Sequence, residues 1–323
     1  VGSSSGTTSY NGNGTVWQVA DIRSGSSSSP GFGGMEILVG DTLYFSANDG
    51  STGHELWAHD TSNSSTWQVA DINNGTAISF PGSEMVILVG DTIYFDANDG
   101  TTGRELWAHD TSNSSTWQVA NINSGSFDSN PGSLMEILVG DTIYFNANDG
   151  TIGREIWAHD TSNSSTWQVT DINSGVGSSD PGSEMAILVG DTIYFDAQDG
   201  ITGHEIWAHD TSNHSTWQVA DINSWGSSDP GYYMAILVGD TIYFDADDVI
   251  TGHELWAHDT SNSSTWQVAD IKSGGSNSNS YPGNAILVGD TIYFEADGGS
   301  TGDELWAHDT SNSSTWLVAD INS

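Results

Sequence analysis

The chain of 323 residues carries 43 acidic and only 4 basic side chains, so its formal net charge at pH 7 is −39. This charge excludes nucleic acid and anionic membrane surfaces as partners, because both are bound through clusters of Lys and Arg. The absence of cysteine excludes disulfides, and no apolar run approaches the ~18 residues that a membrane-spanning helix needs.

The first predicted element is a flexible arm over residues 1–14, which are rich in Gly, Ser, Thr and Asn and show no periodicity. The chain starts at Val1 without a hydrophobic leader, so we expect a mature product. A strand-like segment over residues 15–22 follows and contains the words WQVADI. A WQVADI-like sequence returns near the end of every later repeat, so this segment is an extra copy of a terminal strand.

Six repeats occupy the rest of the chain, with a period of 50 residues that shortens once to 49. Their approximate boundaries are 35–72, 85–122, 135–172, 185–222, 234–271 and 285–321. In the second repeat, four short runs rich in β-branched and aromatic residues lie at 85–89, 92–97, 105–110 and 116–122. Gly90 and Asp91 separate the first two runs and predict a two-residue type II′ hairpin with positive φ at the glycine.

These repeats predict an all-β fold, a six-bladed β-propeller of four-stranded antiparallel blades. All six prolines lie in the connections between repeats, as expected for long links from the outer strand of one blade to the inner strand of the next. An open β-solenoid of the same units is the alternative. In the propeller, residues 15–323 form a single domain.

The repeat also resembles a family of tandem-repeat proteins. Residues 42–60, TLYFSANDGSTGHELWAHD, and residues 65–75, STWQVADINNG, are similar to the ELWxxDGT repeat of large bacterial surface and secreted proteins. The resemblance covers nearly everything from residue 36 to 321. It has two departures: Asp-Thr-Ser-Asn replaces DGT after ELW, and Ala or Thr replaces the basic residue before DI. The resemblance implies a β-propeller-like, extracellular, non-catalytic repeat protein and assigns no substrate.

An Asn-x-Ser/Thr sequon stands four residues before the tryptophan of each WQVADI-like copy. It survives where its surroundings change, as in Asn13-Gly14-Thr15 and in the fourth repeat, where His214 stands inside it. Simple duplication of the repeat would also copy the sequon. We predict N-glycosylation on exposed turns of a secreted protein. The predicted sites are Asn13, Asn63, Asn113, Asn163, Asn213, Asn262 and Asn312, with Asn74 as an eighth candidate.

A glycine-rich turn offers the oxygen ligands that Ca²⁺ prefers. The candidate ligands are Asp96, Asn98, Asp99 and Glu105 in the second repeat, with the counterparts Asp196, Asp199 and Glu205 in the fourth. The alternative is a turn whose Asn and Asp side chains cap their own backbone. The acidic excess can also keep a crowded assembly soluble or suit the protein to a salty habitat.

A histidine follows each ELWA or EIWA element, and we interpret it as a packed side chain rather than a metal ligand. These residues are His59, His109, His159, His209, His258 and His308. Catalysis needs different groups in different roles, whereas near-identical repeats place the same group at six positions. We therefore predict no enzymatic activity; a glycosidase would need one unique pair of carboxylates, and none stands out.

Two functions fit these patterns. The first is a secreted structural protein, an N-glycosylated building block of an extracellular filament or surface layer; the second is a carbohydrate-binding lectin or adhesin. The other repeat elements occur six times but the WQVADI-like strand seven times, so one terminal strand is surplus. We predict that residues 15–22, through Trp17, Val19 and Ile22, are donated to a neighbouring copy, giving a head-to-tail homopolymer. Folding back as a fifth strand of its own blade is the alternative.

Overall fold

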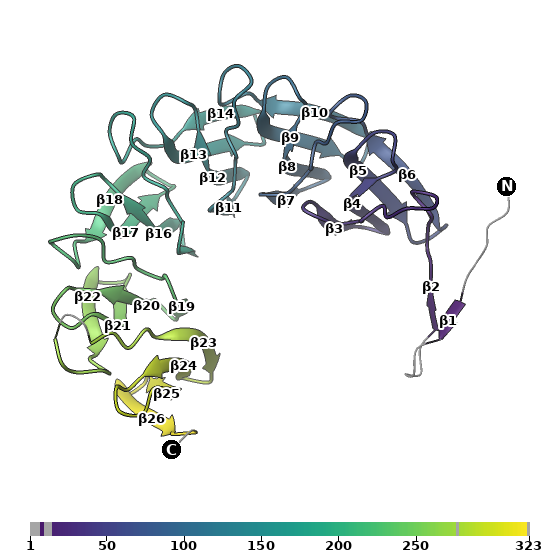
Figure 1. Cartoon of the computed structure of the whole chain (residues 1–323). Coiled ribbons are helices and arrows are strands. Elements are labelled where there is room, and N and C mark those ends of the chain that lie inside the picture. Colours follow the sequence, from purple (N-terminus) through teal and green to yellow (C-terminus); the bar gives the residue numbers. More distant parts are fainter. Residues whose placement is uncertain (1–6, 10–14, 276–277, 322–323) are drawn as a thin grey trace. The chain divides into compact units, whose positions relative to one another are not determined.

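The computed structural model describes residues 7–9, 15–275 and 278–321. All regular elements in these residues are β-strands, and this part of the chain holds no helix long and apolar enough to cross a membrane. The strands form six four-stranded antiparallel sheets and one two-stranded sheet (Figure 1). Each four-stranded sheet uses four consecutive strands, which is the blade construction of a six-bladed β-propeller. The predicted fold class is confirmed.

The blades are numbered 1 to 6 in chain order. Blade 1 consists of β3 (Glu36–Val39), β4 (Thr42–Asn48), β5 (His54–Asp60) and β6 (Ser65–Ala70). Blade 2 consists of β7 (Val86–Val89), β8 (Thr92–Asn98), β9 (Arg104–Asp110) and β10 (Ser115–Ala120). Blade 3 consists of β11 (Glu136–Val139), β12 (Thr142–Asn148), β13 (Arg154–Asp160) and β14 (Ser165–Gln168).

The second half of the chain repeats this pattern. Blade 4 consists of β15 (Ala186–Val189), β16 (Thr192–Gln198), β17 (His204–Asp210) and β18 (Ser215–Ala220). Blade 5 consists of β19 (Ala235–Val238), β20 (Thr241–Asp247), β21 (His253–Asp259) and β22 (Ser264–Ala269). Blade 6 consists of β23 (Gly283–Val288), β24 (Thr291–Asp297), β25 (Asp303–Asp309) and β26 (Ser314–Ala319).

The chain divides into two compact units. One comprises the residues up to 133 together with 147–150, and so contains blades 1 and 2. The other comprises 134–146 and the residues from 151 onward, and so contains blades 4, 5 and 6.

The hairpin between the first two strands of a blade depends on glycine. Gly90 has a φ of +60° and turns β7 into β8, while Asp91 keeps a negative φ. Positive φ at the first turn residue alone agrees with the predicted type II′ turn. The same φ, within 2°, recurs at the equivalent glycine of every blade, so the turn is part of the repeat.

Adjacent blades within a unit pack through a repeated set of buried apolar side chains. At the junction of blades 1 and 2 these are Met35, Tyr44, Leu56 and Ala58 from blade 1, and Ile93, Phe95 and Ala97 from blade 2. We call the first set the trailing face of a blade and the second set the leading face. The junctions of blades 3 and 4, 4 and 5, and 5 and 6 use equivalent residues. Sheets that pack face to face need apolar residues on both sides of each strand, which explains the lack of simple alternation in the sequence.

Candidate functional site at the first and last blades

Six of the eight predicted glycosylation sites lie on equivalent turns, each between the third and fourth strands of a blade. In blade 1, Asn63 is exposed; its Nδ2 donates to Asp60 Oδ2 at 2.6 Å and its Oδ1 accepts the Ser65 N–H at 2.9 Å. The middle residue, Ser64, has a φ of +61°, so the backbone bends inside the sequon. The same contacts recur at Asn113, Asn163, Asn213, Asn262 and Asn312.

The two remaining predicted glycosylation sites lie elsewhere. Asn74 is exposed in the connector between blades 1 and 2. Asn13 lies outside the described residues. Glycosylation at all these positions stays a prediction.

Two predicted Ca²⁺ ligands, Asp96 and Asp196, are buried and already hold protein partners. Asp96 accepts the Met85 N–H at 3.0 Å and forms an ion pair with Arg104. Asp196 lies 3.2 Å from His204 Nδ1, and this contact raises the pKa of the imidazole. Both carboxylates therefore serve as acceptors inside their own blades.

Asn98 and Asp99 cap the turn that follows β8. Asn98 Oδ1 accepts the Gly100 N–H and Asp99 Oδ1 accepts the Thr102 N–H, each at 2.7 Å, and Asp199 caps the equivalent turn of blade 4. These contacts agree with the alternative, a turn whose side chains cap their own backbone. In the described part of the chain, no group of three or more His, Asp or Glu side chains is placed to hold a metal ion. Ca²⁺ binding at this turn stays a prediction.

The repeated histidines are packed side chains, as interpreted from the sequence. His109 Nδ1 lies 2.8 Å from Thr116 Oγ1, and its ring lies 5.3 Å from the ring of Tyr44 in the preceding blade. Burial lowers the pKa of His109, and it lowers that of His209 to about 4. The rings of His109 and His209 are therefore neutral near pH 7, and each contacts a tyrosine of the preceding blade.

The remaining predicted ligands, Glu105 and Glu205, belong to a set of buried glutamates that fasten each blade to the connector after it. In blade 1, Glu55 accepts the Ile72 N–H and the Ser79 hydroxyl, each at 2.7 Å. We call this Glu–Ser contact the latch. Latches of the same length join Glu105 to Ser129, Glu155 to Ser179, Glu205 to Ser228 and Glu254 to Ser280.

The latch serine also holds the following blade, because the Ser79 carbonyl oxygen accepts the Asn98 N–H at 3.0 Å. One residue of the connector is therefore bonded to both blades of a junction. Burial raises the pKa of Glu55 and Glu105 to about 7, since the low-dielectric surroundings disfavour the charged carboxylate.

The extra strand segment, residues 15–22, adds no strand to a blade. Its first part, β2 (Thr15–Trp17), pairs with β1 (Thr7–Ser9), which lies inside the predicted arm, while blade 1 has four strands. The fifth-strand alternative therefore does not describe this arrangement. Trp17 is 64% exposed and Val19 55% exposed.

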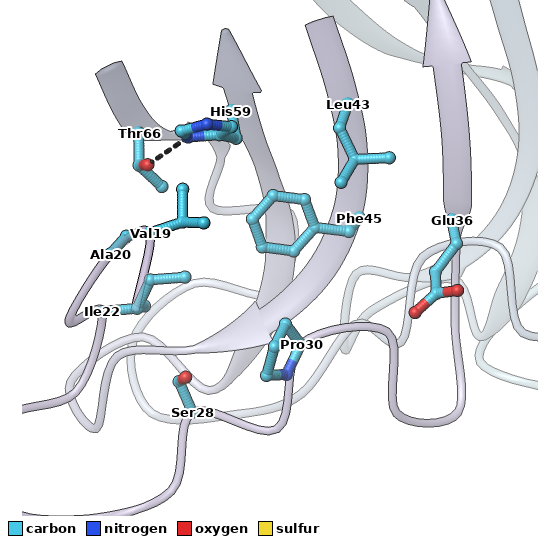
Figure 2. A pocket seen from close by; sticks show the side chains of 10 residues that line it. All are labelled: Val19, Ala20, Ile22, Ser28, Pro30, Glu36, Leu43, Phe45, His59 and Thr66. Atoms are coloured by element: carbon cyan, nitrogen blue, oxygen red, sulfur yellow. Dashed lines mark hydrogen bonds between the residues drawn. The ribbon is translucent and has the colours of Figure 1, made fainter. Parts of the chain in front are cut away.

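The chain that follows β2 covers part of the leading face of blade 1. Val19 and Ile22 point toward Phe45, as Figure 2 shows. Val69 and Ile72 pack in the same way at the junction of blades 1 and 2. The segment after β2 thus contacts the leading face of blade 1 with residues equivalent to those that blade 1 places against blade 2.

The connector that follows Ile22 also contacts blade 1 in the way that an interior connector contacts the blade after it. The Ser28 carbonyl oxygen accepts the Asn48 N–H at 2.9 Å, which is the bond that Ser79 makes with the next blade. Unlike Ser79, Ser28 has no glutamate partner for its hydroxyl among the described residues. Half of a latch is therefore present at the start of the chain.

A pocket of about 420 Å³ remains on the leading face of blade 1, beside Phe45 and His59. In the junction of blades 1 and 2, the trailing face of blade 1 fills the equivalent space with Met35, Tyr44 and Leu56. As a result Leu43 is 37% exposed, whereas its counterpart in blade 2 is fully buried.

Blade 6 carries the other half of a latch. Glu304 accepts the Ile321 N–H at 2.7 Å but has no serine partner in the part of the chain that the structure describes. A second pocket, of about 310 Å³, lies on this trailing face and is lined by Glu304 and Leu305 among others. Asn284 stands where the other blades have a buried methionine, so this face is more polar than the others.

The last strand of blade 6 also lacks a contact that most of the others make. In blade 2, Gln118 Nε2 donates to Thr102 Oγ1 at 2.8 Å, and blades 1, 4 and 5 have the same pair. Leu317 replaces this glutamine in blade 6. The hydroxyl oxygen of Thr301 is consequently buried without a hydrogen-bond partner among the described residues.

The sequence analysis did not single out Ser28, Thr301, Glu304 or Leu317. Their signals were present in the sequence: WLVADI at 316–321 is the only full repeat that departs from WQVA or WQVT at the second letter. The latch serines gave a weaker signal, because they lie in the variable connectors between repeats.

Comparison with known proteins supports the fold. No family model matches the chain, and no curated protein matches it by sequence. Among solved structures it is similar to dipeptidyl peptidase 4 of Porphyromonas gingivalis, with a TM-score of 0.58 and 9% identity over 97% of this chain and 46% of that one. It also matches BamB of Moraxella catarrhalis, with a TM-score of 0.39 and 16% identity over 81% of this chain and 66% of that one.

The chain spans less than half the length of the peptidase it matches. At 9% identity the likeness concerns the fold and not the activity.

Proposed function

We propose that this protein is a secreted, N-glycosylated building block of an extracellular filament, whose copies join head to tail through residues 15–22. The observation that carries the proposal is the surplus strand. The chain has six blades with four strands each, and β2 belongs to none of them. Trp17 and Val19 are more than half exposed, and an apolar strand outside any sheet core is a liability in solution unless a partner covers it.

The position of this strand favours a polymer over a dimer. Residues 15–22 lead directly into blade 1, so the donor belongs to one end of the repeat array. A contact between this end and a different surface of a second copy is heterologous, and such contacts propagate into open filaments when they do not close on themselves. The strand that is donated supplies backbone hydrogen bonds, and its alternate side chains supply specificity.

The sequon turns support an extracellular setting. Each blade presents one exposed asparagine at the same place, so a glycan there projects away from the sheet without disturbing the junctions. The acidic surface keeps a crowded polymer soluble. We assign the protein no catalytic role, because its titratable groups recur in equivalent positions rather than forming one asymmetric set.

Deleting residues 1–22 tests the proposal, with deletion of residues 1–14 as the matched control. Electron microscopy is expected to show filaments for the full chain and for the control, and folded particles without filaments for the longer deletion. Filaments from the chain that lacks residues 1–22 would contradict strand donation. Glycopeptide mass spectrometry of native material should find glycans on Asn63, Asn113 and Asn163, and bare asparagines there would contradict the glycoprotein assignment.

A second candidate function, carbohydrate binding, is favoured by an aromatic cluster between blades 5 and 6. The ring of Tyr233 lies 4.7 Å from that of Tyr232 and 5.1 Å from that of Tyr281, and all three side chains are exposed. Aromatic faces with nearby polar groups are typical of ligand sites. Tyr233→Ala should abolish any binding detected on a glycan array; a response that the variant retains would exclude this cluster.

A further inference from the structure

We infer that residues 15–22 of one copy replace β26 in blade 6 of a second copy and become the fourth strand beside β25. The inference rests on the proposed function, because it identifies the acceptor of the donated strand. The chain itself provides the template, since each interior blade is completed by a strand that leads directly into the next blade.

The two competing strands are nearly identical. Residues 17–22 read WQVADI and residues 316–321 read WLVADI, so they differ at one position. In blade 6 Trp316 lies opposite Ala307, as Trp67 lies opposite Ala58 in blade 1. The donated Trp17 therefore takes the place opposite Ala307.

The one difference favours the donated strand. Leu317 leaves the buried Thr301 hydroxyl without a partner among the described residues, whereas Gln18 brings the amide that interior blades use at this position. A buried hydroxyl without a hydrogen bond is costly, so the exchange removes a defect of blade 6.

The exchange also completes a latch. Glu304 lacks a serine partner and Ser28 lacks a glutamate partner among the described residues. When Ile22 of the donor replaces Ile321, the connector behind it carries Ser28 to the position that Ser79 holds beside Glu55. The subunit contact then has the same Glu–Ser bond as the five latches inside the chain.

The faces at the two ends of the array each expose a leucine at a position that is buried in the interior blades. The exposed Leu43 and the pocket beside Phe45 lie on the leading face of blade 1, and the exposed Leu305 lies on the trailing face of blade 6. Stacking the second onto the first across two copies repeats an interior junction. Such burial contributes more than any single hydrogen bond.

A second copy is the assigned acceptor because of the strand count. Six copies of the last strand complete six blades, and β26 already completes blade 6 of its own chain. The seventh copy lies outside these six blades and is therefore available to a blade of another chain. The exchange has two costs. Val16 replaces Thr315, whose hydroxyl lies 2.8 Å from His308 Nδ1, and the displaced β26 loses its pairing with β25.

Locking β26 in place tests the inference. His308 and Thr315 are register partners, so their Cα atoms lie about 4.5–5.5 Å apart, within the range of a disulfide. The natural chain has no cysteine, so the variant with His308→Cys and Thr315→Cys can form only the intended bond within a chain. The oxidised variant should remain unpolymerised and form filaments once a reductant is added. The two single-cysteine variants are the controls and should polymerise with or without reductant.

Filaments from the locked chain would overturn the exchange and leave the filament proposal intact, because deletion of residues 1–22 tests that proposal separately. A second measurement is needed to show whether the donated strand comes from another copy or from the same chain. Chains with Val16→Cys mixed with chains with His308→Cys should give a disulfide-linked pair beyond what each gives alone. If one chain carrying both changes gives only a one-chain product, the second copy is overturned as the acceptor.

Leu317→Gln tests whether blade 6 prefers the donated strand, which carries Gln18, over its own β26, which carries Leu317. It gives Thr301 a partner from β26, and should lower the extent of polymerisation about fivefold. Gln118→Leu, which removes the equivalent contact from blade 2, is the matched control and should leave polymerisation unchanged. Normal polymerisation of Leu317→Gln would overturn the assigned role of Gln18.

Discussion

Blade 2 and blade 6 have almost the same sequence but not the same completeness. In blade 2, Glu105 has its latch serine, Leu106 is buried and Gln118 reaches Thr102. In blade 6 the equivalent glutamate lacks a serine among the described residues, the leucine is 37% exposed and the threonine lacks a partner there. The difference shows that a repeat of this kind obtains some of its hydrogen-bond partners and part of its burial from the chain that follows it. Stability therefore comes from the junctions as much as from the blades.

Removing the latch glutamate should give the largest difference in stability loss between blade 2 and blade 6. Glu105→Ala removes the acceptor of the Ile122 N–H and leaves the Ser129 hydroxyl only its longer contact with the Arg104 carbonyl oxygen, at 3.1 Å, so it should destabilise the chain by about 4 kcal/mol. Glu304→Ala removes the hydrogen bond from the Ile321 N–H and should cost about 1 kcal/mol. Urea unfolding of the two variants measures both values, and equal losses would contradict the role assigned to the latch.

The trailing-face leucines give the next largest difference. Leu106→Ala opens a cavity at a fully buried site and should cost about 3 kcal/mol. Leu305→Ala changes the equivalent but partly exposed position and should cost about 1 kcal/mol in the unassembled chain. Thermal unfolding in dilute solution compares them; in assembled filaments the two costs are expected to converge, and a persistent gap would argue against burial of Leu305 by another copy.

Acidification should stabilise the chain, because it neutralises the buried latch glutamates. The pKa of Glu55, Glu105, Glu205 and Glu254 is raised to about 7 by burial. The folded chain therefore binds protons that the unfolded chain releases above its ordinary carboxyl pKa of 4.5. This contribution is fully present below the unfolded pKa and is lost as the pH rises through 7, so stability should increase on acidification from about pH 8 to 6.5, by on the order of 2 kcal/mol.

The gain should level off below about pH 6.5, because buried histidines act in the opposite direction. Burial lowers the pKa of His109 and His209, so the unfolded chain binds more protons than the folded chain there. Urea unfolding at a series of pH values checks both the rise in stability between about pH 8 and 6.5 and its levelling below that range. Glu105→Gln should make the rise between pH 8 and 6.5 smaller. Stability that falls between pH 8 and 6.5 would contradict the assignment.

The smallest expected effect comes from the last strand. Leu317→Gln should stabilise the isolated chain by about 1 kcal/mol, because it gives the buried Thr301 hydroxyl a partner. Gln118→Leu should destabilise it by a similar amount through Thr102. Parallel denaturant curves with shifted midpoints would measure these changes; a destabilised Leu317→Gln would show that the hydroxyl needs no partner.

The strands and hairpins could be predicted from the sequence because their signals are local. Gly90 with Asp91 fixes a turn, and the aromatic and β-branched runs around it fix two strands. The end of the fourth strand could not be predicted in the same way. We predicted it at residue 122, but β10 ends at Ala120, because the Ile122 N–H donates to Glu105 instead of to a neighbouring strand.

The candidate sites depended on contacts across longer distances. Asp96 and Asp99 have the residue types of a Ca²⁺ site, but whether they bind an ion or cap a turn depends on where Arg104 and Thr102 lie. The latch joins Glu55 to a serine 24 residues later, in a connector whose sequence changes from one junction to the next. No local pattern marks such a pair. The surplus strand could be found by counting repeats in the sequence. That its Gln18 suits blade 6 could be inferred only after the structure placed the Thr301 hydroxyl in a buried position without a partner among the described residues.

The raised pKa of the latch glutamates also changes the electrical character of the molecule. A count of side chains gives −39, yet four carboxyls with a pKa near 7 are each about half neutral at that pH, which removes roughly two negative charges on folding. When a like charge approaches, such groups take up further protons and so soften the repulsion. A folded chain of this kind adjusts its charge by these few units, which lowers the repulsion between acidic molecules in mildly acidic surroundings.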